Sequence, residues 1–464
     1  MFETINRRRF VRVAGSAACA GSLIGHGLHP ADGQVPAAAA SAQQTVTVEL
    51  PRGRVPLSFI IDDSTCLVNM GKFCMPQFAA TYPQREDYQR PWREWPDEIP
   101  DSFVREFGEW CAEQGVKGKY SVVPFPACVG WLDRTLPGWS QTQLQESLKL
   151  VRELMLPNWD IHPEMITHTR AIDLKTGRPF ADFSPKHMEN SYPPADVSVD
   201  YLTSYLAYAL RILKNCDLPC EGITTPGGFG NNVKDKLPLA VFDAVRDVYG
   251  SELPHYFKYV VFDEDSTEPK LEAIRDRNSE HPKVTANVLA GTGDWFGGWD
   301  GFDQSQGERY SNEDATSGRM VEMIERRQPA VMLCHWPGLY SNGSLAGFHD
   351  FQRVVLALSK RYQDQTLWMK LSEIARYWTA KEFTEIVADG NEIRLRAQFA
   401  CENFTVRVTG HQATGIQLIQ PGTAPIPLAS VSTLPSLGKN QMLRTGDDLL
   451  LCFDLPKGDC KLAW

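Results

Sequence analysis

The sequence predicts an α/β protein in which a closed or nearly closed β/α barrel of about seven strands precedes a small C-terminal all-β domain. Between residues 50 and 380, amphipathic helical segments alternate with short apolar segments, a pattern typical of parallel strands joined by helices. Near Lys381 the pattern changes to short alternating runs rich in Val, Leu, Ile and Phe, separated by Gly, Asn and Asp. The 464 residues also exceed one average domain of roughly 100 to 200 residues, which favours two folded parts.

The N-terminal stretch has the features of an export signal. Arg7 and Arg8 precede Phe10, and a weakly hydrophobic run rich in Ala and Gly leads to small residues that end at Ala42. Residues 1–42 thus resemble a twin-arginine signal peptide, and we expect the mature chain to be exported to the periplasm or the extracellular space. No later run of about 20 apolar residues could span a membrane.

Charge and cysteine content exclude two classes of protein. The formal net charge of -10 leaves no overall basic field to hold a phosphate backbone, so nucleic acid is not an expected partner. None of the cysteines after Cys19 has the paired spacing of a zinc site. Cys216 and Cys220 could form a disulfide in an oxidising compartment, whereas we expect most of the other cysteines to be reduced core residues.

The barrel, predicted over residues 43–380, begins with a strand at 56–63. The helix at 101–115 follows Pro100, places Phe103 and Phe107 on one face and stops at Gly115, and a strand begins at once at 119. The same order of a helix followed by a strand is predicted for five more pairs of segments. They are 142–155 and 158–168, 200–215 and 221–230, 237–250 and 256–264, 315–328 and 330–336, and 348–362 and 366–371. The remaining residues, 383–464, predict a compact, sandwich-like β domain in which no pattern suggests chemistry.

Polar residues gather where the predicted strands end. In a parallel β/α barrel the loops after the strands build the active site, so side chains at these ends are expected to share one rim. For any one of these polar residues the alternative is that it has no function and is polar only because strand ends are exposed. The strand ends carry Asp62 and Asp63; Asp160, His162, Glu164 and His168; TTPGGFG at 224–230; GTGDWFGGWD at 291–300; and Cys334, His335 and Trp336.

These motifs, in this order, resemble those of the polysaccharide deacetylase superfamily, which includes the NodB-type carbohydrate esterases and folds as a distorted β/α barrel. The resemblance covers roughly residues 50 to 380. In FIIDD it implies that Asp62 is the base and Asp63 a metal ligand. In WDIHPEMITH it places Glu164 and His168 at two positions, four residues apart, where the family has two histidine ligands. In VMLCHW it implies that His335 is the general acid.

Two further motifs match in part. GDWFGG matches the Asp-Trp pair of the family at Asp294 and Trp295, whereas TTPGGFG keeps Pro226 but has Thr224 where the family has an arginine. We expect Asp294, Trp295 and Pro226 to bind substrate. Trp299 and Trp336 lie in the same motif regions, and aromatic faces can stack on sugar rings, although core packing explains most tryptophans equally well.

The resemblance implies an exported, metal-dependent hydrolase that removes acetyl groups from a carbohydrate. A divalent ion would be held by Asp63, Glu164 and His168, with His162 as the alternative to Glu164. Two carboxylates and one imidazole suit Zn, Mn, Fe or Co, and three protein ligands leave a position open for water. Asp62 would take the proton of that water, and His335 would protonate the leaving group.

Two alternatives stay open at the level of the sequence. A glycoside hydrolase on a similar barrel would need two carboxylates about 5 to 9.5 Å apart, with Asp62 or Asp63 paired with Asp294 or Glu164 and no metal. A catalytically inactive, carbohydrate-binding relative would keep the scaffold and lose the chemistry. Glu164 in place of a histidine and Thr224 in place of an arginine are departures that such a relative would show.

Overall fold

The computed structural model describes residues 45–464, apart from 64, 66, 263–264, 390 and 411–413. The predicted signal peptide, residues 1–42, lies outside the described residues. Within the described part of the chain, no helix has both the length and the apolar character that a membrane span requires.

The first sheet is parallel and is built around β2 (Val55–Asp62). On one side β2 pairs with β11 (Ala330–His335), and on the other with β3 (Gly118–Ser121), which pairs in turn with β4 (Trp159–His162). β12 (Thr366–Trp368) pairs with the beginning of β2. Every residue of β2 is buried, as expected for a near-continuous apolar strand covered on both faces.

The second sheet has the order β7-β8-β10-β9. β7 (Gly222–Thr224), β8 (His255–Phe257) and β10 (Lys283–Asn287) are parallel, whereas β9 (Lys270–Arg275) is antiparallel to β10. Two isolated bridges join the two sheets. Glu164, which lies after β4, pairs with Thr224 of β7, and Asp294, which lies after β10, pairs with Leu333 of β11. The barrel is therefore distorted and not closed, which corrects the expectation of a closed or nearly closed ring.

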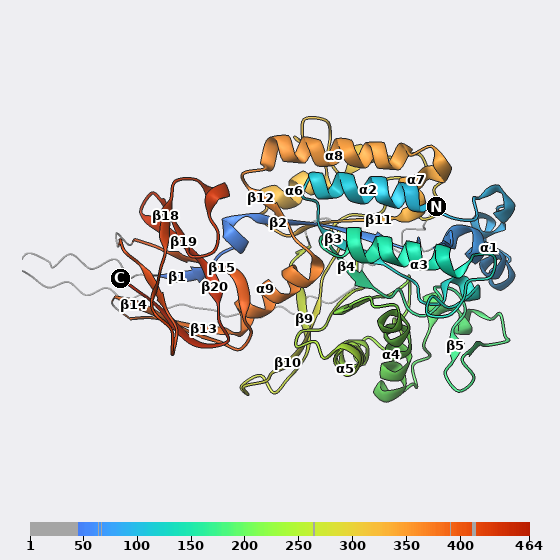
Figure 1. The fold of residues 1–464 in the computed structure, drawn as a ribbon, viewed down its shortest axis with the longest axis horizontal. Helices are drawn as coiled ribbons and strands as arrows, with labels where there is room; N and C mark the ends of the chain where they lie inside the picture. Colours follow the sequence, from blue (N-terminus) through green and yellow to red (C-terminus); the bar gives the residue numbers. More distant parts are fainter. Residues whose placement is uncertain (1–44, 64, 66, 263–264, 390, 411–413) are drawn as a thin grey trace, which may run out of the picture. The chain divides into compact units, whose positions relative to one another are not determined.

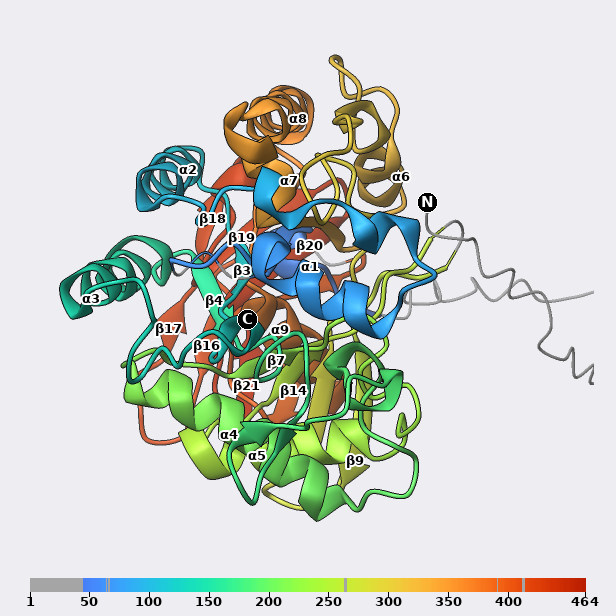
Figure 2. The same ribbon diagram turned by 90° about the vertical axis from the view of Figure 1, so that its right-hand side faces the viewer.

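Helices pack against the outer faces of the strands. Phe59 of β2 stacks on Phe351 at 4.6 Å and lies 6.5 Å from Phe107, so two helices meet on one strand residue. These two helices are labelled α8 and α2 in Figure 1, where they lie side by side. Beside the second sheet, α4 and α5 pack against each other (Figure 2). The helices are α1 (Met70–Thr81), α2 (Asp101–Glu113), α3 (Gln141–Leu150), α4 (Val199–Asn215), α5 (Leu237–Tyr249), α6 (Arg319–Glu325), α7 (Trp336–Tyr340), α8 (Ala346–Tyr362) and α9 (Leu371–Phe383).

Alternation along β2 separates an outer core from the barrel interior. Phe59 and Ile61 belong to the core that the helices cover, whereas Ile60 belongs to a second core that continues into the C-terminal region. Successive side chains of a strand point to opposite faces, so Asp62 shares the interior face with Ile60. The register pairs Lys119 with Ile60 and His335 with Asp62, which places all of these side chains on the interior face.

The C-terminal region is all-β, as predicted, and consists of two five-stranded sheets. Their orders are β1-β15-β20-β19-β18 and β13-β14-β21-β16-β17, and residues such as Phe404 and Leu462 of the two sheets share one core. β1 (Val46–Val48) pairs with β15 (Cys401–Val408), a long-range contact that the sequence pattern did not predict. The other strands are β13 (Thr384–Asp389), β14 (Glu392–Ala397), β16 (Gln417–Ile419), β17 (Ile426–Pro427), β18 (Ala429–Val431), β19 (Gln441–Thr445), β20 (Asp448–Leu455) and β21 (Gly458–Ala463).

The pairing of β2 with β3 depends on a glycine. A Cβ at Gly118 would lie 1.9 Å from the backbone oxygen of Phe59, so Gly118→Ala must push the two strands apart. We expect this substitution to lower the free energy of unfolding by about 3 kcal/mol, measured by equilibrium denaturation followed through tryptophan fluorescence. Gly438→Ala is the matched control, because its Cβ would meet nothing closer than 3.4 Å. Equal stability of the two variants would contradict the prediction.

Candidate metal centre and active site

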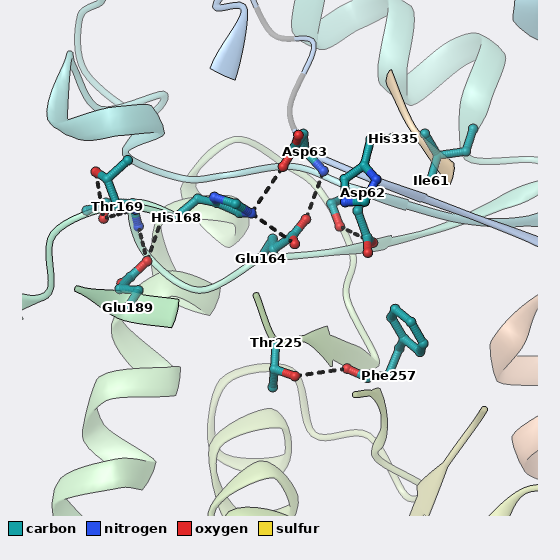
Figure 3. A network of polar contacts seen from close by, with 12 residues as sticks. Ile61, Asp62, Asp63, Glu164, His168, Thr169, Glu189, Thr225, Phe257 and His335 are labelled. Atoms are coloured by element: carbon teal, nitrogen blue, oxygen red, sulfur yellow. Dashed lines mark hydrogen bonds and ion pairs between the residues drawn. The ribbon is translucent and has the colours of Figure 1, made fainter. Parts of the chain in front are cut away.

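Three predicted ligands meet at the rim where β2 and β4 end. His168 Nε2 lies 3.1 Å from Asp63 Oδ1 and 3.2 Å from Glu164 Oε1. One ligand atom from each residue lies within 4.8 Å of the other two. Figure 3 shows the imidazole of His168 directed at the two carboxylates. The structure thus brings together the three residues that the sequence analysis named as metal ligands.

The backbone turns sharply at two of these residues. Asp63 has φ 65° and His168 has φ 63°, values in the left-handed region that residues other than glycine seldom adopt. Such conformations persist where the surrounding contacts enforce them, and they cluster at functional sites. One such contact is the hydrogen bond that the Asp63 N–H donates to Glu164 Oε2 at 2.9 Å.

The cluster stabilises positive charge at its centre. Burial disfavours the imidazolium of His168, but the charges of Asp63 and Glu164 outweigh burial and hold its pKa well above the usual value. Burial alone would raise the pKa of Glu164, yet the charge and hydrogen bond of His168 lower it to about 2. Asp63 Oδ1 is buried, and its contact with His168 Nε2 is an ion pair at 3.1 Å. A divalent ion therefore fits this donor set, in which one imidazole lies between two carboxylates.

Glu189 supports the loop that carries His168, and the sequence analysis did not identify it. It begins the short helix Glu189–Ser191 and is fully buried. Burial raises the pKa of Glu189 to about 7, against the effect of its hydrogen-bond donors. Glu189 lies outside the strand-end motifs, so no sequence signal marked it. Its carboxylate accepts hydrogen bonds from the backbone N–H groups of Ile166 (3.1 Å), Thr167 (2.9 Å) and His168 (2.5 Å) and from the Tyr205 hydroxyl (2.5 Å).

The two residues predicted to act as base and acid are neighbours. β11 pairs with β2 in a register that sets His335 directly beside Asp62, so both lie on the same rim (Figure 3). This register places the two residues side by side rather than across the barrel mouth from each other. Burial and the charge of Glu164 raise the pKa of Asp62 to about 6, against the charges of Lys119 and His335.

Asp294 contacts His335, although the sequence analysis predicted that it binds substrate. Its Oδ2 accepts a hydrogen bond from His335 Nδ1 at 2.7 Å. Burial acts against the imidazolium, but this hydrogen bond and the charges of Asp63, Asp294 and Asp62 raise the pKa of His335 to about 10. Asp294 therefore orients the imidazole and favours its protonated form.

His162 lies apart from the metal cluster. Its Nε2 is 2.9 Å from His255 Nε2 and its Nδ1 is 3.3 Å from Thr224 Oγ1, and the side chain is fully buried. His162 is the last residue of β4 and faces the barrel interior, whereas Glu164 lies beyond the strand, after Pro163. It does not fit as the alternative to Glu164. Thr224, buried against this histidine, supplies no positive charge.

Trp336 is a core residue. It is fully buried as the first residue of α7, and its ring packs edge-on against Phe107 at 5.0 Å and Tyr120 at 5.5 Å. This packing corrects the expectation that Trp336 contacts substrate. Pro226, two residues after the end of β7, is buried as well.

Two other predicted aromatic residues are partly exposed. Trp295 stacks under the guanidinium of Arg309 at 4.2 Å, and Trp299 packs edge-on against Tyr88 at 6.0 Å. Tyr88 lies near enough to His168 for the charge of that imidazole to lower its pKa, against a larger rise caused by burial. The sequence analysis missed Tyr88 because it precedes the second strand of the barrel and belongs to no strand-end motif.

The carboxylates that a glycoside hydrolase would use are already engaged. Glu164 is bound to His168 and to the Asp63 N–H, and Asp294 is bound to His335. The arrangement therefore favours metal chemistry over the two-carboxylate mechanism.

Comparison with solved structures finds several that are similar to this chain at low sequence identity. A protein described as a polysaccharide deacetylase from Mycobacterium smegmatis is 12% identical over 74% of this chain and 97% of its own, with a TM-score of 0.42. A mutant of a CE4 family pseudoenzyme with restored enzymatic activity is 9% identical over 71% of this chain and 70% of its own, with a TM-score of 0.30. The alpha-fucosidase of Thermotoga maritima is 11% identical over 89% and 96%, with a TM-score of 0.28.

No protein family model matches the chain, and no curated protein matches its sequence. Because each of these TM-scores is below 0.5, the interpretation of the site rests on the contacts of its own side chains.

We predict that the folded protein binds one divalent ion and that Asp63→Asn and His168→Ala each lower its affinity for that ion at least 10-fold, because each removes one of three ligands. Metal content after dialysis, measured by elemental analysis, and titration with Zn²⁺ or Mn²⁺ check this. His281→Ala, which changes an exposed histidine, is the control. Variants that bind the ion as tightly as the control would show that the ion lies elsewhere.

Proposed function

We propose that this protein is a metal-dependent hydrolase that removes acetyl groups from a carbohydrate outside the cytoplasm. The observation that carries the proposal is the meeting, on one rim, of a three-ligand cluster, a buried carboxylate and a histidine with its own carboxylate partner. The order of the motifs along the chain supports a carbohydrate as the substrate.

Hydrolysis of an acetyl group requires an activated water, a polarised carbonyl and a proton for the leaving group. Asp63, Glu164 and His168 would hold a divalent ion, which would supply Lewis acidity and lower the pKa of water. Asp62 takes the proton of the attacking water. Its Oδ1 is occupied by Lys119 and Ser121, so Oδ2 is the oxygen without a contact from these two residues. A pKa of about 6 suits a base that works near neutral pH.

His335 delivers a proton to the departing amine or alkoxide. Because Nδ1 is bonded to Asp294, Nε2 is the ring nitrogen left to face the substrate. The raised pKa of about 10 keeps the imidazole protonated at neutral pH, as a general acid requires. Trp299 and Tyr88, which pack together and are partly exposed, offer aromatic surface on which a sugar ring can stack.

The test is release of acetate from acetylated chitooligosaccharides and from an acetylated chromogenic ester, with and without a chelator. We expect turnover that the chelator abolishes and that added Zn²⁺, Mn²⁺, Fe²⁺ or Co²⁺ restores. Cleavage of glycosidic bonds that the chelator leaves unchanged would favour a glycoside hydrolase instead. Sugar binding without any turnover would show a carbohydrate-binding protein, and either result would overturn the proposal.

Asp294→Asn gives a pH-dependent test of the acid. The substitution keeps the shape but removes the negative charge that raises the pKa of His335. The general acid must be protonated, so activity falls as the pH rises through its pKa. We expect this alkaline limb to move to lower pH in the variant, in pH profiles of kcat. Asp303→Asn, an exposed residue of the same loop, should leave the limb unchanged, and an unmoved limb in Asp294→Asn would contradict the role of His335.

A further inference from the structure

Lys119 is a fully buried lysine in the barrel interior, directly beneath the candidate site. It lies in β3, where the register pairs it with Ile60 of β2. Its side chain therefore shares the interior face with Asp62, two residues beyond Ile60 along β2. Lysine is almost never fully buried unless it is paired, so this position calls for a specific partner.

The ammonium group has three acceptors for its three N–H bonds. Lys119 Nζ lies 2.5 Å from Asp62 Oδ1, 2.7 Å from Ser121 Oγ and 3.5 Å from the backbone oxygen of Ile61. The ring of Phe257 lies 5.7 Å from the same nitrogen. The lysine is thus held from several sides, and its strongest contact is with Asp62.

Asp62 needs a cation because it is buried beside other carboxylates. Asp63, the next residue along the chain, and Glu164 both belong to the metal cluster. The negative charge of Glu164 disfavours the ionised form of Asp62. Among the residues that the structure describes, Asp62 has side-chain hydrogen bonds with Lys119 and Ser121, and both are made to Oδ1. Thr224, where the motif resemblance predicts an arginine, is neutral and faces His162. The cation that hydrogen-bonds to Asp62 therefore comes from β3 and not from β7.

We propose that Lys119 is a positioning residue for the base: it anchors Asp62 Oδ1 from the barrel interior and thereby fixes the direction of Oδ2. This inference rests on the proposed function, in which Asp62 takes a proton from water. Ser121 completes the anchor, because it contacts both Lys119 and Asp62. Lys119 acts through Asp62, and among the described residues no hydrogen bond or ion pair joins its ammonium group to a metal ligand.

A purely structural ion pair would also be lost in a Lys119 variant, and removal of one partner from a buried pair destabilises a protein whatever its function. The experiment therefore separates catalysis from stability. Lys119→Met, Lys119→Arg and the control Lys117→Met are prepared with bound metal, and kcat, KM and metal content are measured on an acetylated ester. Lys117 precedes the same strand and pairs with Glu373 outside the site.

We expect Lys119→Met to lower kcat about 100-fold with KM and metal content unchanged, and Lys119→Arg to recover part of that loss. Lys117→Met should behave like the unchanged protein. A kcat of Lys119→Met within about 2-fold of the control, or a loss of kcat that merely follows a loss of metal, would overturn the inference.

Two further measurements test the role of Lys119 if the Lys119→Met variant does not fold or if the protein releases no acetate. If Lys119→Met does not fold, the neutral pair Asp62→Asn with Lys119→Met is compared with Asp62→Asn alone. No additional loss of kcat is expected, because Lys119 acts through Asp62, and an additional large loss would contradict this. If the unchanged protein releases no acetate, the proposed function fails. The positioning role of Lys119 is then tested by a crystal structure of Lys119→Met, or of the double variant, that shows the orientation of the side chain at position 62. A side chain at position 62 that keeps its orientation without the lysine would overturn it.

Discussion

The parallel pairing of β2 with β11 is the constraint on which the candidate site depends. It sets His335 beside Asp62 in register, and a slip of one residue would turn one of the two side chains into the outer core. The close approach of β3 at Gly118 completes this arrangement, because it brings Lys119 under the end of β2. The positions of His335 and Lys119 relative to Asp62 are thus set by strand register and not by loops.

Burial of charge explains why the polar residues of the site occur in partnered groups. An ionised side chain that leaves water must be paired or hydrogen-bonded, and each ionised group here has such a partner. His168 lies between Asp63 and Glu164, Lys119 holds Asp62, and Asp294 holds His335. The cluster of Asp63, Glu164 and His168 differs from the other two pairs, since it has two carboxylates for one imidazole and thus a negative excess that a divalent ion would balance.

Irregular segments complete what the strands begin. His168 follows no helix or strand directly, yet the carboxylate of Glu189 fixes its backbone through three consecutive N–H groups. Left-handed residues such as Asp63 are held in the same way by contacts rather than by local preference. Such supports carry little sequence signal, because an isolated glutamate or aspartate in a turn is common on any surface. For the same reason the edge strands β1 and β9, which are short or half-exposed, were not predicted.

The sequence by itself determined that buried apolar runs form parallel strands, because strand ends are visible as the place where an apolar run turns polar. It also determined that Asp62, Asp63 and His335 stand at such ends and that Glu164 and His168 lie in the segment after one of them. Only the tertiary structure decided which of these groups meet. Asp294 and His335 are 41 residues apart, and Lys119 and Asp62 are 57 apart, so their contacts depend on register and on how the two sheets join. Trp336 follows a strand and His162 ends one, as expected of site residues, yet both point away from the metal cluster. Trp336 packs on Phe107 and His162 contacts His255, and no short stretch of sequence encodes such long-range packing.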